Sequence, residues 1–92
     1  MTKAEIISKV SDSTGIDKVL VSVALESFFV EVKDALAGND NVYVRGFGSF
    51  IVKTRKAKKA RNISVGATVM VPEHQVPAFK PAKEFVEQIK SK

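Results

Sequence analysis

Positively charged side chains are concentrated in one short stretch, Lys53–Arg61, which reads KTRKAKKAR. Six of its nine residues are cationic, none is acidic, and its only aliphatic side chains are two alanines. Lysine and arginine at this density bind anionic partners, and phosphate groups above all. The stretch lies within the chain, between RGFGSFIV and ISVGATVMVP. We therefore expect the fold to hold it out in solvent.

The overall charge is divided unevenly along the chain. Residues 1–44 contain four Lys and seven Asp or Glu, a net charge of −3. Residues 45–92 contain eight Lys, three Arg and three Glu, a net charge of +8. This asymmetry predicts that the first half forms a scaffold and that the second half meets an anionic partner.

Groups that could support catalysis or hold a metal are sparse. The chain has one histidine, His74, and no cysteine, and Gly46–Gly48 is too short for a phosphate-cradling nucleotide loop. We predict no enzymatic activity, no cofactor, no metal and no small-molecule substrate. The sequence has no apolar run of about 18 residues and no signal-peptide pattern, so we expect a cytoplasmic protein with no membrane partner.

Two helices are expected in the first half of the chain. Thr2 with Glu5 fits a capping box, and Gly15 is placed to end the first helix. Asp17 is the expected N-cap of the second helix, which Gly38 and the residues after it end. The second helix has one apolar face, broadened by two adjacent phenylalanines. This breadth favours a dimer, although a sheet could also cover the face within a monomer.

Strands are expected next. Val42–Arg45 and Ser49–Val52 have strand composition, and the GFG sequence between them forms a tight turn. The second strand should continue through the basic stretch to Asn62 as a protruding arm, since it is too long and too polar to be core. We expect a reversal at residues 62–66 and a return strand at Ala67–Val71.

The remaining residues complete the predicted fold. Pro72 and Pro77 mark a transition rather than a central strand, and Phe79 is expected in the core. Pro81 suits the first turn of a last helix, with an apolar stripe at Ala82, Phe85, Val86 and Ile89. The predicted class is α+β, a single domain over residues 1–92. Its parts are a helical dimerisation region at about 1–40, a sheet and arm at about 41–79, and a C-terminal helix at about 81–91.

The basic stretch itself predicts phosphate binding. Strand alternation would place Lys53, Arg55, Lys59 and Arg61 on one face, with Lys56 and Lys58 on the other. Nothing in the sequence resembles a recognition helix, so we expect contacts to phosphates, little sequence preference and a strong salt dependence. DNA and RNA are both compatible with this chemistry. One alternative is a solvated surface strand that has no partner. Another is an arm that binds acidic proteins or membranes.

Three motifs together resemble one known family. They are RGFGSF at residues 45–50, Arg61-Asn62 with Gly66 four residues later, and VPAFK at residues 76–80. The chain is similar in these motifs, and over its whole length, to the bacterial histone-like HU and integration host factor family. The resemblance implies an intertwined dimer with an α-helical body, a small antiparallel sheet, and a long protruding β-ribbon arm from each subunit. It also implies that the arms embrace the minor groove and kink the duplex with an apolar wedge.

The resemblance assigns roles to individual residues. Arg55, Lys58, Arg61 and Asn62 match arm positions that contact DNA, and Lys3 and Lys83 match body positions that grip flanking phosphates. Ser49 matches a position near the DNA backbone, and Arg45 resembles the basic residue of the integration host factor branch. The family has proline and threonine where this chain has Ile63 and Val65. Ile63 is then either the wedge or a residue that packs in the tip or is mobile, since it lacks the rigid ring of proline.

The predicted function is that of a histone-like architectural protein that binds the minor groove and bends and compacts chromosomal DNA in the nucleoid. A site-specific DNA-bending protein like integration host factor, or a structure-selective DNA or RNA binder, is the alternative. Double-stranded DNA is the expected partner, with distorted DNA or RNA as the alternatives, and a homodimer is the expected assembly. The predicted DNA-binding residues are Lys3, Arg45, Ser49, Lys53, Arg55, Lys56, Lys58, Lys59, Arg61, Asn62, Ile63, Lys80 and Lys83.

Overall fold

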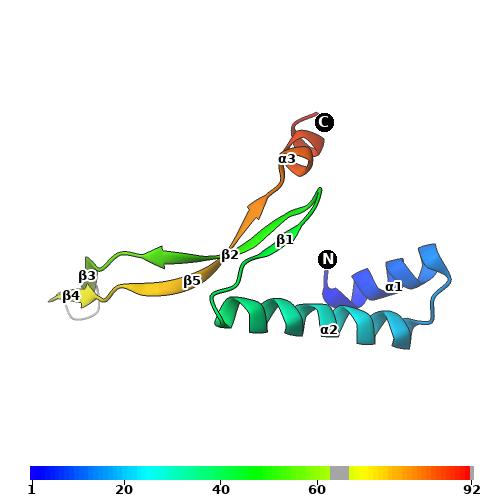
Figure 1. Cartoon of the computed structure of the whole chain (residues 1–92), viewed down its shortest axis with the longest axis horizontal. Coiled ribbons are helices and arrows are strands. Elements are labelled where there is room, and N and C mark those ends of the chain that lie inside the picture. Colours follow the sequence, from blue (N-terminus) through cyan, green and yellow to red (C-terminus); the bar gives the residue numbers. More distant parts are fainter. Residues whose placement is uncertain (63–66, 92) are drawn as a thin grey trace. The chain divides into compact units, whose positions relative to one another are not determined.

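The computed structural model describes residues 1–62 and 67–91. The chain forms two compact units, Met1–Asp34 and Ala35–Lys92 (Figure 1). The first unit contains helix α1 (Lys3–Thr14) and most of helix α2 (Lys18–Ala37). The second contains five strands and the C-terminal helix.

Local side-chain to backbone hydrogen bonds set the limits of α1 and the start of α2. The backbone N–H of Glu5 donates to the Thr2 side chain at 3.3 Å, and Gly15 closes α1 in the left-handed conformation. The backbone N–H of Val19 donates to the Asp17 carboxylate at 2.8 Å, directly at the start of α2. These three predicted boundaries are confirmed.

The end of α2 lies where the sequence predicts it, directly before Gly38. The helix ends at Ala37, but Asn39 rather than Gly38 takes the positive φ, at 63°. The backbone N–H of Asp40 then donates to the Ala35 carbonyl at 2.8 Å, which satisfies one of the last helical carbonyls. Asparagine tolerates this conformation better than most residues with a side chain, so the glycine is not needed for the turn.

The first unit leaves its apolar surface open. Val21 on α2, at 8 % exposure, is its most buried hydrophobic side chain besides Val32. A hollow of about 330 Å³ lies between the two helices, and apolar side chains line it, among them Ile6, Val10, Leu20, Leu25 and Phe28. A helix pair with this little buried surface does not form a core by itself.

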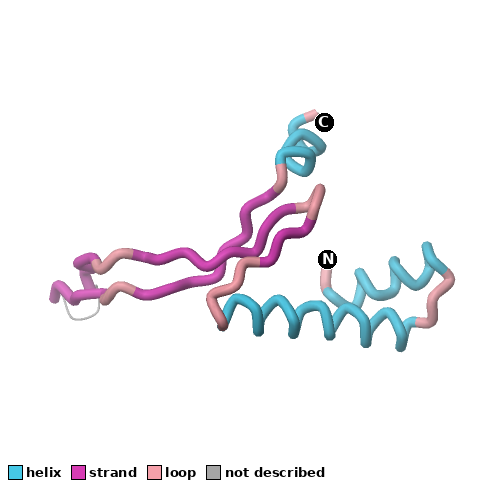
Figure 2. Tube along the Cα trace, viewed as in Figure 1, coloured by secondary structure: helices cyan, strands magenta, loops and turns pink. Residues whose placement is uncertain are grey.

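The second unit is built on a three-stranded antiparallel sheet in the order β1-β2-β5. Figure 2 shows β2 and β5 running side by side and continuing into a second, two-stranded ribbon of β3 and β4. Helix α3 follows β5. The bounds are β1 Val42–Val44, β2 Gly48–Arg55, β3 Lys58–Asn62, β4 Ala67–Val71, β5 His74–Pro81 and α3 Lys83–Lys90.

Two strand predictions need correction. The strand predicted to run unbroken to Asn62 stops at Arg55, and β3 begins at Lys58. The return strand β4 therefore pairs with β3 only, while β2 pairs with β5 from Gly48↔Pro81 to Arg55↔His74. The segment predicted as a transition is strand β5. It lies at the edge of its sheet, where a proline such as Pro77 is tolerated because one side of the strand has no partner strand.

The start of α3 also differs from the prediction. Pro81 is the last residue of β5, and the helix begins at Lys83 after Ala82. The backbone N–H of Ala82 donates to the Phe47 carbonyl at 2.9 Å, which ties the extended chain to the β1–β2 turn. Pro81 pairs with Gly48 in the ladder of β2 and β5, so it remains in the sheet and the helix begins after it.

Four phenylalanines form the apolar centre of the second unit. The Phe47 ring lies 5.0 Å from Phe79 and 5.3 Å from Phe85 between centroids, and Phe50 lies 5.2 Å from Phe79. Phe79 is thus part of this cluster, as predicted, but it is still 40 % exposed. Phe47, with 44 % of its surface exposed, is also incompletely covered by its own chain.

Gly48 allows the close approach of β2 to β5, and we expect its replacement to destabilise the fold. A Cβ at this position would lie 2.6 Å from the Lys80 carbonyl oxygen and 2.6 Å from the Phe79 ring. Gly48→Ala should lower the free energy of unfolding by about 1–3 kcal/mol, because the backbone or the ring must shift. Urea denaturation followed by circular dichroism measures the change.

Gly46→Ala is the matched control for that substitution. Gly46 has a φ of 81°, but nothing lies within 4 Å of an added Cβ. It should therefore cost only the backbone strain of about 1 kcal/mol. A smaller loss for Gly48→Ala than for Gly46→Ala would contradict the packing explanation.

Candidate nucleic-acid interface

The three-stranded sheet has two chemically different faces. The cross-strand row Val42, Phe50 and Phe79 lies on one face, together with Val44 and Val52. No charged residue of β1, β2 or β5 falls on this face, which carries two rings of the phenylalanine cluster. This is the face that packs into a core.

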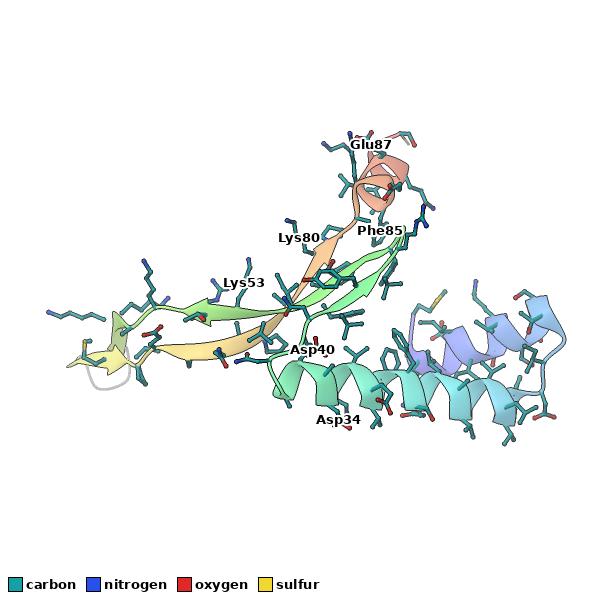
Figure 3. The ribbon with its side chains drawn as sticks, in the orientation of Figure 1. Asp34, Asp40, Lys53, Lys80, Phe85 and Glu87 are labelled. Carbon is teal, nitrogen blue, oxygen red and sulfur yellow. The ribbon has the colours of Figure 1, made fainter. Side chains whose placement is uncertain are left out.

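The opposite face carries all the cations of these three strands. Alternation along β2 places Ser49, Lys53 and Arg55 on it, and the register adds Lys80 opposite Ser49 and His74 opposite Arg55. Figure 3 shows Lys53 and Lys80 extending from β2 and β5 on the same side of the sheet. The predicted common face for Lys53 and Arg55 is therefore confirmed. We call this surface the cationic face.

The start of α3 continues the cationic face. A hollow of about 630 Å³ is lined by Arg45, Ser49, Lys80 and Lys83, together with Tyr43. Ala82 is the N-cap of α3 and has no side chain that could cap the helix. The first backbone N–H groups of α3 are thus left for another acceptor, and a helix N-terminus favours an anion. The site brings together four of the predicted residues.

The ribbon of β3 and β4 extends the cationic chemistry along the arm. Lys58 and Lys59 are exposed in β3, and Lys56 lies in the two-residue break between β2 and β3. A second hollow of about 690 Å³ at this break is lined by Arg55, Lys56 and Lys58, with His74 on the opposite strand. The prediction placed four cations on one face of a continuous strand, namely Lys53, Arg55, Lys59 and Arg61. Because the strand is interrupted after Arg55, alternation no longer places the last two on the same face as the first two.

Three of the predicted DNA-binding residues lie near the tip of the arm, where the first described part of the chain ends at residue 62. Ile63 lies outside the described residues, as do the side chains of Arg61 and Asn62. The backbone of the latter two belongs to β3, in register with Thr68 and Ala67. The role of Ile63 as a wedge stays a prediction.

Lys3 belongs to the first unit, whereas all the other predicted DNA-binding residues belong to the second. Its ammonium group forms an ion pair with the carboxylate of Glu26 on α2, and both side chains are about half exposed. Sequence reasoning missed this pair because its members lie 23 residues apart. The carboxylate of Glu26 therefore competes with a phosphate for this ammonium group.

We expect Glu26→Gln to strengthen nucleic-acid binding by releasing Lys3. Each additional phosphate contact steepens the dependence of log Kd on log salt by about 0.9 for duplex DNA. A salt series by fluorescence anisotropy measures this slope. Glu31→Gln is the control, since it removes the same charge from an exposed position on the same helix. Equal slopes for the two variants would show that general charge, and not the release of Lys3, is responsible.

Tyr43 was not among the predicted residues. It lies at the centre of β1 between two half-buried valines and is 74 % exposed. The V-Y-V alternation placed it opposite the apolar face, which was the available signal.

Among the described residues, no group of three or more His, Asp or Glu side chains could hold a metal ion. None of the described helices has the length and apolar character required to cross a membrane.

Comparison with known proteins identifies the family. Residues 1–90 match the family described as bacterial DNA-binding protein. The chain belongs to this family. Curated relatives include HU proteins: the chain is 37 % identical to the SPbeta prophage-derived DNA-binding protein HU 2 of Bacillus subtilis, over all of both chains. It is also 37 % identical to the DNA-binding protein HU of Geobacillus stearothermophilus, over 98 % of this chain and 100 % of that one.

Solved HU structures share the fold. The HU of an Anabaena HU–DNA cocrystal is 30 % identical and superposes with a TM-score of 0.92 over 97 % of each chain. HU from Thermotoga maritima is 27 % identical and has a TM-score of 0.69, over 97 % of this chain and 98 % of that one. The predicted membership of the HU family and the predicted α+β fold are confirmed.

Proposed function

We propose that this chain is an architectural DNA-binding protein of the HU type, which binds duplex DNA through phosphate contacts and bends it. The observation that carries the proposal is the cationic face, where Lys53, Arg55 and Lys80 lie opposite a face of the same sheet that carries no charged residue. The arm extends the positive charge beyond the sheet. The HU–DNA cocrystal of the Anabaena relative supports the choice of duplex DNA as the ligand.

The working form is a dimer of two copies of this chain. Fifteen large hydrophobic side chains are exposed among the described residues, and only Val21 and Val32 are buried. Each unit also has an open apolar hollow, about 330 Å³ between α1 and α2 and about 360 Å³ beside Phe79, Phe85 and Ile89. A second copy can fill both hollows and complete a single domain over residues 1–92. Family membership supports this assembly.

The predicted residues divide into three groups in this proposal. Arg45, Ser49, Lys80 and Lys83 bind phosphates beside the N-terminus of α3. Along the arm, Lys53, Arg55, Lys56, Lys58, Lys59, Arg61 and Asn62 follow the minor groove, and Ile63 probes a base step. Lys3 holds a flanking phosphate after it leaves Glu26. No part of the mechanism needs a catalytic group, and a nucleoid-associated protein in the cytoplasm fits this role.

The sequence-tolerant function has to be separated from the two alternatives. A competition series should compare linear, nicked, four-way and random-sequence duplex DNA with duplex RNA, at 50 and 200 mM salt. With about six to ten phosphate contacts, affinity for every DNA should fall by roughly 10³–10⁵ between these conditions. A large preference for one defined sequence, added to the series as a further competitor, would instead indicate site-specific bending. A large preference for nicked, four-way or RNA duplexes over linear DNA would indicate a structure-selective role. Absence of binding at 50 mM salt would overturn the proposal.

A further inference from the structure

Tyr43 lies at the end of a row of hydrogen-bond donors that crosses the whole sheet. It pairs with Ser49 on β2, and Ser49 pairs with Lys80 on β5. Directly paired residues of neighbouring strands project to the same face, so a phenol, a hydroxyl and an ammonium group lie side by side. Neighbouring strands are about 4.8 Å apart, so the row spans about 10 Å.

The surroundings of Tyr43 are rich in donors and contain no acid. It lines the hollow of about 630 Å³ together with Arg45 and Lys83, and no Asp or Glu lines that hollow. Val42 and Val44 on either side of it are half-buried on the apolar face, whereas Tyr43 is 74 % exposed. Its ring therefore contributes little to the packing of its own chain. A tyrosine has only two side-chain torsions, so fixing it against a ligand costs little entropy.

We propose that the Tyr43 phenol donates a hydrogen bond to a DNA phosphate oxygen at the β1 edge of the cationic face. This contact extends the row of Ser49 and Lys80 by one strand. The inference rests on the proposed function, since it needs DNA to lie on this face. A phosphate contact carries no sequence information, so the bond strengthens binding to every duplex equally.

The Tyr43→Phe variant tests the hydrogen bond directly. It keeps the ring and removes only the hydroxyl. Because the side chain is exposed, we expect the variant to fold as the wild type does, and its thermal midpoint checks this. We expect about a three- to tenfold loss of affinity for random-sequence duplex. The slope of log Kd against log salt should stay unchanged, because no charge is removed. Wild-type affinity in Tyr43→Phe would overturn the proposal.

A second measurement observes the site itself. The chain contains one tyrosine and no tryptophan, so 3-fluorotyrosine labelling gives a single ¹⁹F resonance that reports Tyr43 alone. Addition of duplex DNA should shift this resonance, with saturation at the stoichiometry seen by anisotropy. An unshifted resonance in a fully bound sample would show that DNA does not reach β1. That result would leave the proposed function intact, whereas failure of the wild-type protein to bind any duplex would remove both.

Discussion

Replacing Lys53 and Lys80 together with alanine will flatten the salt dependence of DNA binding. Both side chains lie on the cationic face, one on β2 and one on β5. Each lost phosphate contact lowers the slope of log Kd against log salt by about 0.9, and two copies of the chain lose four contacts. We expect the slope to fall by about 3 to 4. Anisotropy titrations between 50 and 300 mM salt measure it.

The control for this variant removes the same charge from elsewhere. Lys9 on α1 and Lys33 on α2 are exposed in the first unit, and Lys9→Ala with Lys33→Ala changes the net charge by the same amount. This pair should leave the slope nearly unchanged, because counterion release depends on the phosphates contacted and not on total charge. If both double variants flatten the slope equally, the cationic face has no special part in binding.

Phe47→Ala should cost the protein about 3 kcal/mol of stability. Phe47 contacts Phe79 and Phe85, with the Phe85 ring stacked at 16°, and its removal leaves a cavity at the centre of the cluster. The value is at the lower end of the range for buried phenylalanines because 44 % of the side chain is exposed in the single chain. Urea unfolding by circular dichroism measures it.

The same experiment tests the dimer. If a second copy covers the cluster, the unfolding midpoint of the wild-type protein should rise with protein concentration, and Phe47→Ala should lower it at every concentration. Phe47→Leu is the control, since it keeps most of the apolar volume and should cost less. A wild-type midpoint independent of concentration would show that one chain is stable alone.

The elements that the sequence predicted well are those that local interactions define. Thr2, Gly15 and Asp17 act on backbone groups within a few residues, so their patterns are visible in the sequence. The strand β5 was missed because Pro77 argues against a strand, and only the position at a sheet edge makes it acceptable. Edge position is a property of the assembled sheet and cannot be read from the prolines themselves.

The candidate site follows the same division. Alternation within β2 was enough to place Lys53 and Arg55 on one face. That Lys80 and Ser49 join them depends on the register of β2 with β5, which connects residues about 30 positions apart in the chain. The family resemblance supplied Ser49 and Lys83 where spacing could not. It did not supply Tyr43, since that residue becomes a candidate only through its exposure and its partners across the sheet.

The arm is interrupted on both strands at the same level. The ladder of β2 and β5 ends at Arg55↔His74, and that of β3 and β4 begins at Lys58↔Val71, so two residues on each side lie between the ladders. Bending at this level breaks no pairing in either ladder, and it therefore costs less than bending anywhere within them. The arm therefore consists of two strand ladders that are connected by a short unpaired segment on each strand. These unpaired segments let the ladder of β3 and β4 follow grooves of different width and path, while β2 and β5 keep their places in the three-stranded sheet. A protein that binds DNA without selecting its sequence needs this freedom.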